Sequence, residues 1–127
     1  MRSPTTEGTP EPDLAKMERW TAWVIRLTGH AAGQTDLPSV RERLQGATED
    51  AESLREALAA AASGWLDAGQ IAIVRSVYEL WDANHDRTER VAALVDPMWH
   101  RRWRMRSAGA RPELAPAASE HSLSAVG

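Results

Sequence analysis

A regular apolar repeat between residues 37 and 65 constrains the fold of this chain more than any other feature. Apolar side chains recur at alternating steps of three and four residues, at Leu37, Val40, Leu44, Ala47, Ala51, Leu54, Leu58, Ala61 and Trp65. Because an α-helix has about 3.6 residues per turn, this spacing places all of them along one face. Such a face is stable in water when another helix packs against it. The repeat therefore predicts a long helix with a neighbouring helix beside it.

Shorter repeats on both sides of this segment predict the other helices. Helical spacing places Met17, Trp20, Val24, Leu27 and Ala31 on one face, which predicts a helix over about 13–30. Helical spacing of apolar residues also predicts helices over about 65–83, 86–95 and 97–106. Residues 71–74 taken alone could form a strand, but the length of the helical pattern around them favours a helix.

Polar residues at particular positions predict where helices begin. Ser39 with Glu42, and Asp86 with Glu89, have the spacing of a capping box, in which each side chain binds a free amide of the first turn. Asp96 stands directly before a proline, which is favoured at the first helical position. Helices are therefore expected to start next to Ser39, Asp86 and Asp96.

These patterns together predict an all-α protein, a compact bundle of four to five helices formed by residues 13–106. The N-terminal arm, 1–12, and the C-terminal tail, 107–127, are expected to be disordered. Both are rich in small, polar and proline residues, so they can bury too little apolar surface to offset the entropy lost on ordering.

The composition excludes several functional classes. The chain has no cysteine, so it has no disulfide, no thiolate metal site and no cysteine nucleophile. It also lacks a glycine-rich phosphate loop and the usual motifs of a nucleophilic serine. Its longest apolar run, 57–62, is far shorter than the roughly 18 residues of a membrane span. The N-terminus lacks the apolar segment of an export signal. We expect a cytoplasmic, non-enzymatic protein without a cofactor.

Asp82, Asn84 and Asp86 resemble the opening of an EF-hand calcium loop. The resemblance covers about six residues and lacks the most specific positions of that loop. Arg87 stands where the tight turn needs glycine, and Ala93 stands where the bidentate glutamate should be. We therefore expect a polar junction between two helices and no calcium site.

Histidines offer little indication of a metal site. The four histidines stand at positions 30, 85, 100 and 121, and no two have the spacing of a helical metal motif. A mixed site of His85 with Asp82 and Asp86, joined by His100 through the fold, is the one arrangement left open. A histidine in a turn is more often a solvated or capping residue, so the sequence predicts no metal.

The segment 99–106 has the most unusual composition, with Trp99, Arg101, Arg102, Trp103, Arg104 and Arg106. In a structural interpretation, both tryptophans complete the core and the arginines pair with acidic residues. Alternatively, the arginines neutralise phosphates while the tryptophans stack on bases, or the helix lies on an anionic membrane or a partner helix. The structural interpretation is favoured, because acidic residues outnumber basic ones over residues 1–98 and would repel phosphate.

The apolar repeat favours a function through protein contacts. We predict a small interaction protein, an adaptor or regulator, that forms a homodimer through the seam of Leu44, Leu54 and Leu58. Trp65 and the segment 99–106 are further candidate contact residues. The alternative is a nucleic-acid-associated regulator that uses the segment 99–106. The dependence of partner binding on salt concentration distinguishes these two functions, because phosphate contacts weaken steeply as salt rises and apolar contacts do not.

Overall fold

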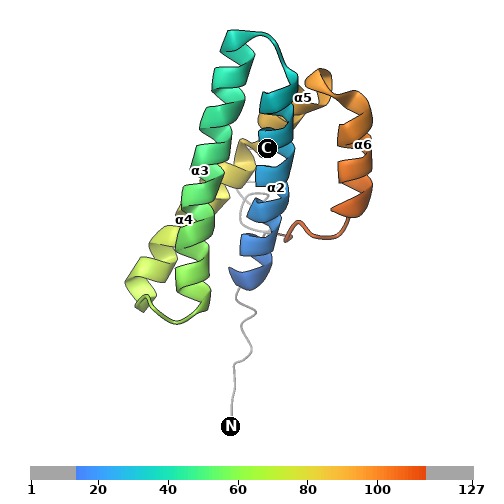
Figure 1. Cartoon of the computed structure of the whole chain (residues 1–127). Coiled ribbons are helices and arrows are strands. Elements are labelled where there is room, and N and C mark those ends of the chain that lie inside the picture. Colours follow the sequence, from blue (N-terminus) through green and yellow to red (C-terminus); the bar gives the residue numbers. More distant parts are fainter. Residues whose placement is uncertain (1–13, 114–127) are drawn as a thin grey trace, which may run out of the picture.

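Two long antiparallel helices, α2 (Leu14–Gln34) and α3 (Pro38–Ala62), form the centre of the protein (Figure 1). The computed structural model describes residues 14–113. A short connection, residues 35–37, joins the two helices, so they pack side by side along much of their length. The predicted long helix and its neighbour are confirmed. α2 continues to residue 34, past its predicted end at residue 30.

Three shorter helices complete an all-α fold within residues 14–113. They are α4 (Ala68–Ala83), α5 (His85–Val95) and α6 (Pro97–Arg106). Figure 1 shows α4 and α5 behind the α2–α3 pair, with α6 on the opposite side of α2 from α3. The predicted bundle is confirmed, with five helices in this range. None of these helices is long and apolar enough to cross a membrane.

The core is centred on the inward face of α2. The predicted face is buried at all five positions, Met17, Trp20, Val24, Leu27 and Ala31. Thr21 and Thr28 are also fully buried, and a buried hydroxyl is costly without a partner. Their hydroxyls donate to carbonyl oxygens one turn earlier, at 2.9 and 3.1 Å. The two threonines therefore lie in the core with their hydrogen-bonding groups satisfied.

Two of the predicted helix starts are wrong by two residues, because the cap positions are Leu37 and Asn84 where Ser39 and Asp86 were expected. α3 begins at Pro38 and makes no side-chain cap, so Ser39 and Glu42 form no capping box. Proline is favoured in the first turn, and it moves the start ahead of Ser39. α5 likewise begins one residue before Asp86, and no side chain caps it. Glu89 is therefore free to make the different contacts described below.

The start of α6 is confirmed. Asp96 caps this helix, because its Oδ1 accepts a hydrogen bond from the backbone N–H of Trp99 at 3.2 Å. α4 has a complete capping box that was not predicted, formed by Asp67 and Gln70. The amide of Gln70 donates to Asp67 at 2.8 Å, and the amide of Asp67 donates to the Gln70 side chain at 2.9 Å. Both boundaries are thus fixed by local hydrogen bonds.

The folded region continues past its predicted end at residue 106. Ser107 is buried, and Nε of Arg111 donates to Oδ1 of Asp82 at 3.0 Å. The Arg111 guanidinium also lies 5.8 Å from the centre of the Trp20 ring. Part of the predicted tail is therefore held against α2 and α4 by contacts between residues far apart in sequence. Residues 1–13 and 114–127, with the predicted arm and the rest of the tail, lie outside the described range.

Candidate functional site

The leucines of the predicted dimer seam point into the core of their own chain. Leu44 and Leu58 are fully buried, and Leu54 is 6% exposed. All three belong to the hydrophobic cluster that includes the inward face of α2. A partner could not contact them unless the domain opened. We therefore assign these leucines to the core.

Trp65, another predicted contact residue, lies in the connection between α3 and α4 and is 80% exposed. A tryptophan buries a large apolar area when it finds a partner, so an indole left this open is unusual in a folded domain. Trp65 therefore remains a candidate contact residue.

The structure divides the segment 99–106 into a packed side and an exposed side. Trp103 is 3% exposed, and its Nε1 donates to the carbonyl oxygen of Trp23 at 2.7 Å. Trp99 is half-buried and stacks on the His30 ring, with the ring centres 4.0 Å apart. The tryptophans thus contribute to the fold, as the structural interpretation requires. The exposed side carries Arg101, Arg102, Arg104 and Arg106.

A groove that was not predicted from the sequence lies between α3, α4 and α5. Its volume is about 690 Å³. Its α4 wall consists of Ile73, Val77 and Leu80, which are 64%, 47% and 68% exposed. Other apolar lining residues include Val24, Ala47, Leu54, Ala57, Val74 and Trp81. The polar lining residues are Asp50, Ser53, Asn84 and Thr88, and the imidazole of His85 also lines the groove.

The groove exists because α4 has apolar residues on two faces. One face, with Tyr78 fully buried and Val74 and Trp81 half-buried, packs onto the core. The second face carries Ile73 and Val77 and points away from it. A helix that is apolar on both faces is normally covered on both faces. Within residues 14–113, the outward face of α4 is therefore left uncovered.

Glu89 is the centre of a buried polar cluster beneath α5 and α6. The Nε2 atoms of His85 and His100 donate to its two carboxylate oxygens, at 3.1 and 2.7 Å. Arg104 donates to one of these oxygens at 2.9 Å. His85 is itself 2% exposed and packs edge-on against the ring of Trp20. One carboxylate thus joins the start of α5 to two turns of α6.

The charge of Glu89 is stabilised by its donors. The hydrogen bond from His85 contributes most, followed by that from His100, and together they outweigh the cost of burial. They lower the pKa of Glu89 from 4.5 to about 2. Glu89 is therefore a carboxylate, not a proton donor, at neutral pH.

Several buried polar atoms near this cluster have no hydrogen-bond partner among the described residues. They are Nε1 of Trp20, the hydroxyl of Tyr78 and Nδ1 of His85. Burial, reinforced by the charge of Asp82, raises the pKa of Tyr78 above its ordinary value. Tyr78 thus keeps its proton at neutral pH, and this centre offers no phenolate nucleophile.

The residues of the calcium-loop resemblance lie in α4, in the junction that follows it and in α5. Asp82 belongs to α4, and Asn84 forms the junction with α5 and donates from its side chain to Leu80 O at 2.9 Å. The guanidinium of Arg111 forms ion pairs with both carboxylates, at 3.0 Å from Asp82 and at 3.4 Å from Asp86. A fixed guanidinium competes directly with any bound cation. The mixed histidine arrangement is also altered, because His85 and His100 meet at Glu89 and not at Asp82.

Calcium is expected to leave the stability of the protein unchanged. Arg111 already neutralises Asp82, and the bidentate glutamate of a calcium loop is missing. Thermal melting in about 1 mM calcium should match melting in chelator, since even weak calcium modules bind at this concentration. A chelator-reversible rise in melting temperature, lost in Asp82→Asn, would contradict this prediction.

Donor atoms of His85, Asp86 and Glu89 lie within 4.8 Å of one another, close enough to suggest a metal site. Within residues 14–113, however, the Glu89 oxygens already accept from two histidines and from Arg104. The positive charge of Arg104 opposes a second cation at the same carboxylate. The arrangement is accounted for by hydrogen bonding.

The comparison of this chain with models of protein families, with curated proteins and with solved structures finds no match.

Proposed function

We propose that this protein is a non-enzymatic interaction domain of the cytoplasm, and that it binds an apolar helix of a protein partner in the α4 groove. The observation that carries the proposal is the exposure of Ile73, Val77 and Leu80. They stand at the i, i+4 and i+7 positions of one helix face and line a groove large enough for side chains of a second helix. Exposed apolar patches with polar rims are typical of interaction sites.

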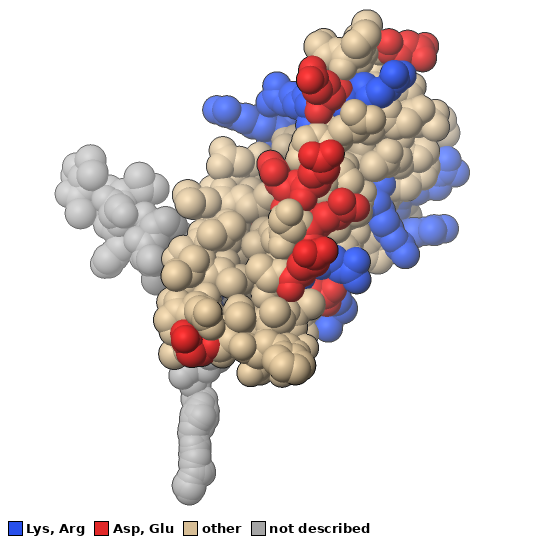
Figure 2. Space-filling view, turned by 60° about the vertical axis from the view of Figure 1, so that its left-hand side comes forward, with Lys and Arg blue, Asp and Glu red and all other residues tan. Residues whose placement is uncertain are grey.

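The charges around the groove favour a partner helix with basic flanks. Figure 2 shows a row of acidic side chains beside a surface with few charges. The exposed residues Glu42, Glu49, Glu52 and Glu56 lie along one face of α3, and Asp50 borders the groove itself. Lysine or arginine beside the apolar positions of a docked helix would face these carboxylates. Such complementarity increases the rate and specificity of association more than its final affinity.

A second copy of the chain is another occupant that this groove can accept. The homodimer predicted from the sequence cannot use Leu54, which lies in the core. The exposed α4 residues Ile73, Val77 and Leu80 form one wall of the groove. A twofold axis could therefore place this α4 face of each copy in the groove of the other copy. The molar mass of the purified chain at ~100 μM, measured by light scattering, distinguishes a dimer through α4 from a monomer that binds a different protein.

Charged substitutions in the groove are expected to abolish partner binding without unfolding the protein. In Val77→Asp plus Leu80→Asp, two carboxylates would be buried at the interface, which costs several kcal/mol unless they are paired. Both side chains are exposed in the free protein, so its stability should change by less than about 1 kcal/mol. Affinity capture from the native host, with bound proteins quantified for wild type and variant, provides the measurement.

The matched control is Leu94→Asp plus Met105→Asp. These two apolar residues are 82% and 74% exposed, lie outside the groove and introduce the same charge. This control should keep the captured proteins, or the dimer, that the groove variant loses. An identical set of bound proteins in wild type and both variants, with all three monomeric, would contradict the proposal.

A further inference from the structure

A second surface, separate from the α4 groove, lies between α2 and α6. It is a hollow of about 320 Å³ lined by Trp23, Arg26, Trp99, Arg102, Trp103 and Arg106. All six lining residues are tryptophan or arginine. The proposed docking of a helix on α4 makes no use of this hollow.

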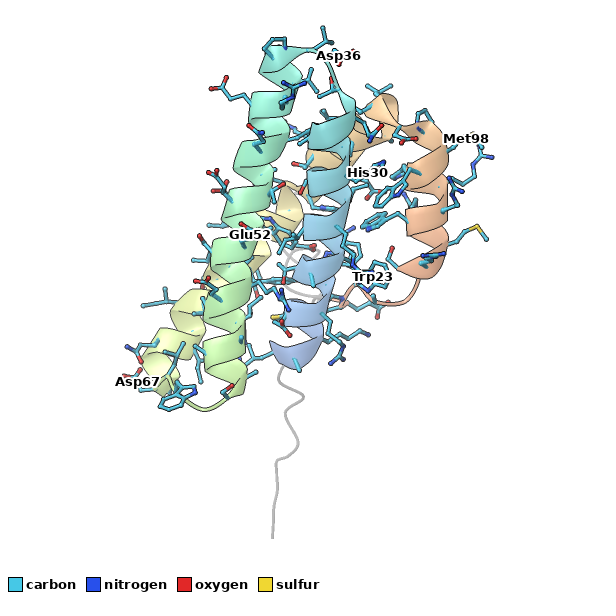
Figure 3. The ribbon with its side chains drawn as sticks, viewed as in Figure 1. Trp23, His30, Asp36, Glu52, Asp67 and Met98 are labelled. Carbon is cyan, nitrogen blue, oxygen red and sulfur yellow. The ribbon has the colours of Figure 1, made fainter. Side chains whose placement is uncertain are left out.

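Helical spacing brings the three arginines together. Trp23 and Arg26 stand on the side of α2 that faces α6, where Figure 3 shows Trp23 and His30. Arg102 and Arg106 are four residues apart, so they share one face of α6. The Arg26 guanidinium lies 5.0 Å from the centre of the Trp23 ring. Two helices thus direct three guanidinium groups at one small space.

No carboxylate within residues 14–113 forms an ion pair with Arg26, Arg102 or Arg106. Asp96 is close enough for Arg102 to help lower its pKa, after the larger effects of its hydrogen bonds. Its carboxylate already accepts from His30 Nε2 at 2.9 Å and from the Trp99 amide at 3.2 Å. Three like charges held together without a counter-ion repel one another, so an anion in the hollow is favoured.

The aromatic rings of the hollow are held in position. Trp99 is fixed by stacking on His30, with the two ring planes 10° apart. Trp103 is fixed by its hydrogen bond to the carbonyl oxygen of Trp23. Trp23 and Trp99 remain partly exposed, so each has some indole surface that a ligand can contact. A planar aromatic group can therefore stack here without reorganising the protein.

We infer that this hollow binds a nucleotide unit, with its phosphate at Arg26, Arg102 and Arg106 and its base stacked on Trp23 or Trp99. A site that combines guanidinium groups with indoles matches a ligand that combines a phosphate with an aromatic ring. The unit can belong to single-stranded nucleic acid or to a free nucleotide. Duplex DNA is excluded as the preferred form, because its paired bases are not free to stack on the rings.

The test uses the full chain and the double variant Arg102→Gln plus Arg106→Gln. Arg90→Gln plus Arg101→Gln is the matched control, since both residues are exposed and lie outside the hollow, and the variant removes the same charge. Binding of a fluorescent oligothymidylate of about eight nucleotides is followed by anisotropy between about 50 and 200 mM salt. The Arg102 and Arg106 variant should lose at least about tenfold in affinity, and its salt slope should fall by about 0.7, the value for one phosphate contact of a single strand. The control should lose much less.

Two further probes distinguish the source of the nucleotide and the role of the rings. Saturable binding of thymidine monophosphate that displaces the oligonucleotide identifies one nucleotide as the ligand, whereas binding of the oligonucleotide alone identifies the single strand. Trp23→Leu should weaken either ligand about tenfold while inorganic phosphate binds as before. Melting temperatures confirm that the variants are folded. Equal losses in both arginine variants, equal affinity for a duplex, or no binding at about 50 mM salt would overturn the inference.

Discussion

Replacing Trp103 with alanine is expected to lower the free energy of unfolding by about 3 to 5 kcal/mol. Trp103 is 3% exposed and packs on the Trp20 ring, with the ring centres 5.6 Å apart. The substitution leaves a large cavity between α6 and α2 and removes the hydrogen bond from Nε1 to the carbonyl oxygen of Trp23. For a domain of about 100 residues, this corresponds to a fall in melting temperature of at least about 12 °C.

Two companion variants show where the effect of Trp103→Ala comes from. Trp103→Phe keeps most of the buried ring but loses the hydrogen bond, so it should cost about 1 to 2 kcal/mol. Met105→Ala removes a side chain that is 74% exposed on the same helix and should change stability by less than about 0.5 kcal/mol. Urea unfolding gives all three values. A cost below about 1 kcal/mol for Trp103→Ala would mean that α6 does not pack on α2 in solution.

The helices were predictable because their signal is local. The apolar repeat of α3 and the shorter repeat of α2 are visible in sequence order. The α2 face is buried as expected, and the α3 face is buried or half-buried from Val40 to Ala61. The two ends of the longer repeat, Leu37 and Trp65, lie outside α3 and are 62% and 80% exposed. The position of Trp103 inside the fold follows from the same reasoning, since it is four residues from Trp99 on one helical face. Local spacing therefore predicts which residues form helices and, for most of them, which side faces inward.

The α4 groove was missed because spacing cannot rank two apolar faces of one helix. Val74, Tyr78 and Trp81 form one stripe, and Ile73, Val77 and Leu80 form another beside it. The apolar spacing that predicts a helix over about 65–83 does not show which of the two stripes faces the core. A helix with two adjacent apolar stripes was nevertheless a visible signal of a candidate contact surface.

The role of Glu89 was also misread, for a different reason. Its spacing from Asp86 predicted a capping box, but the cap position of α5 is Asn84, two residues earlier, and Glu89 is buried. Its partners His100 and Arg104 are 11 and 15 residues away and come from another helix. Hydrogen bonds between helices depend on how the helices cross, which a one-dimensional pattern does not contain. The hollow between α2 and α6 was not predicted either, because it also depends on how two helices lie against each other.

Glu89→Gln is expected to destabilise the protein by about 3 kcal/mol at neutral pH, because removing one charge from a buried, hydrogen-bonded cluster leaves its partners unsatisfied. An amide presents one acceptor oxygen where the carboxylate presents two, so it cannot accept from both His85 and His100 in the same geometry. Glu52→Gln is the matched control, since Glu52 is an exposed residue of α3 with no ion pair among the described residues. It should change stability by less than about 0.5 kcal/mol.

The same variant separates the contribution of Glu89 to acid unfolding from that of other carboxylates. Glu89 has a pKa of about 2 in the fold and an ordinary value of 4.5, so the folded state binds its proton more weakly than the unfolded chain. Its stabilisation is therefore fully present above pH of about 4.5 and declines as the pH falls toward 2. Between pH 6 and pH 3, about 2 kcal/mol of this contribution should disappear from wild type and from Glu52→Gln, beyond any loss in Glu89→Gln. Parallel curves of stability against pH for wild type and Glu89→Gln would show that Glu89 titrates normally in the fold, and that its three donors do not act on it in solution.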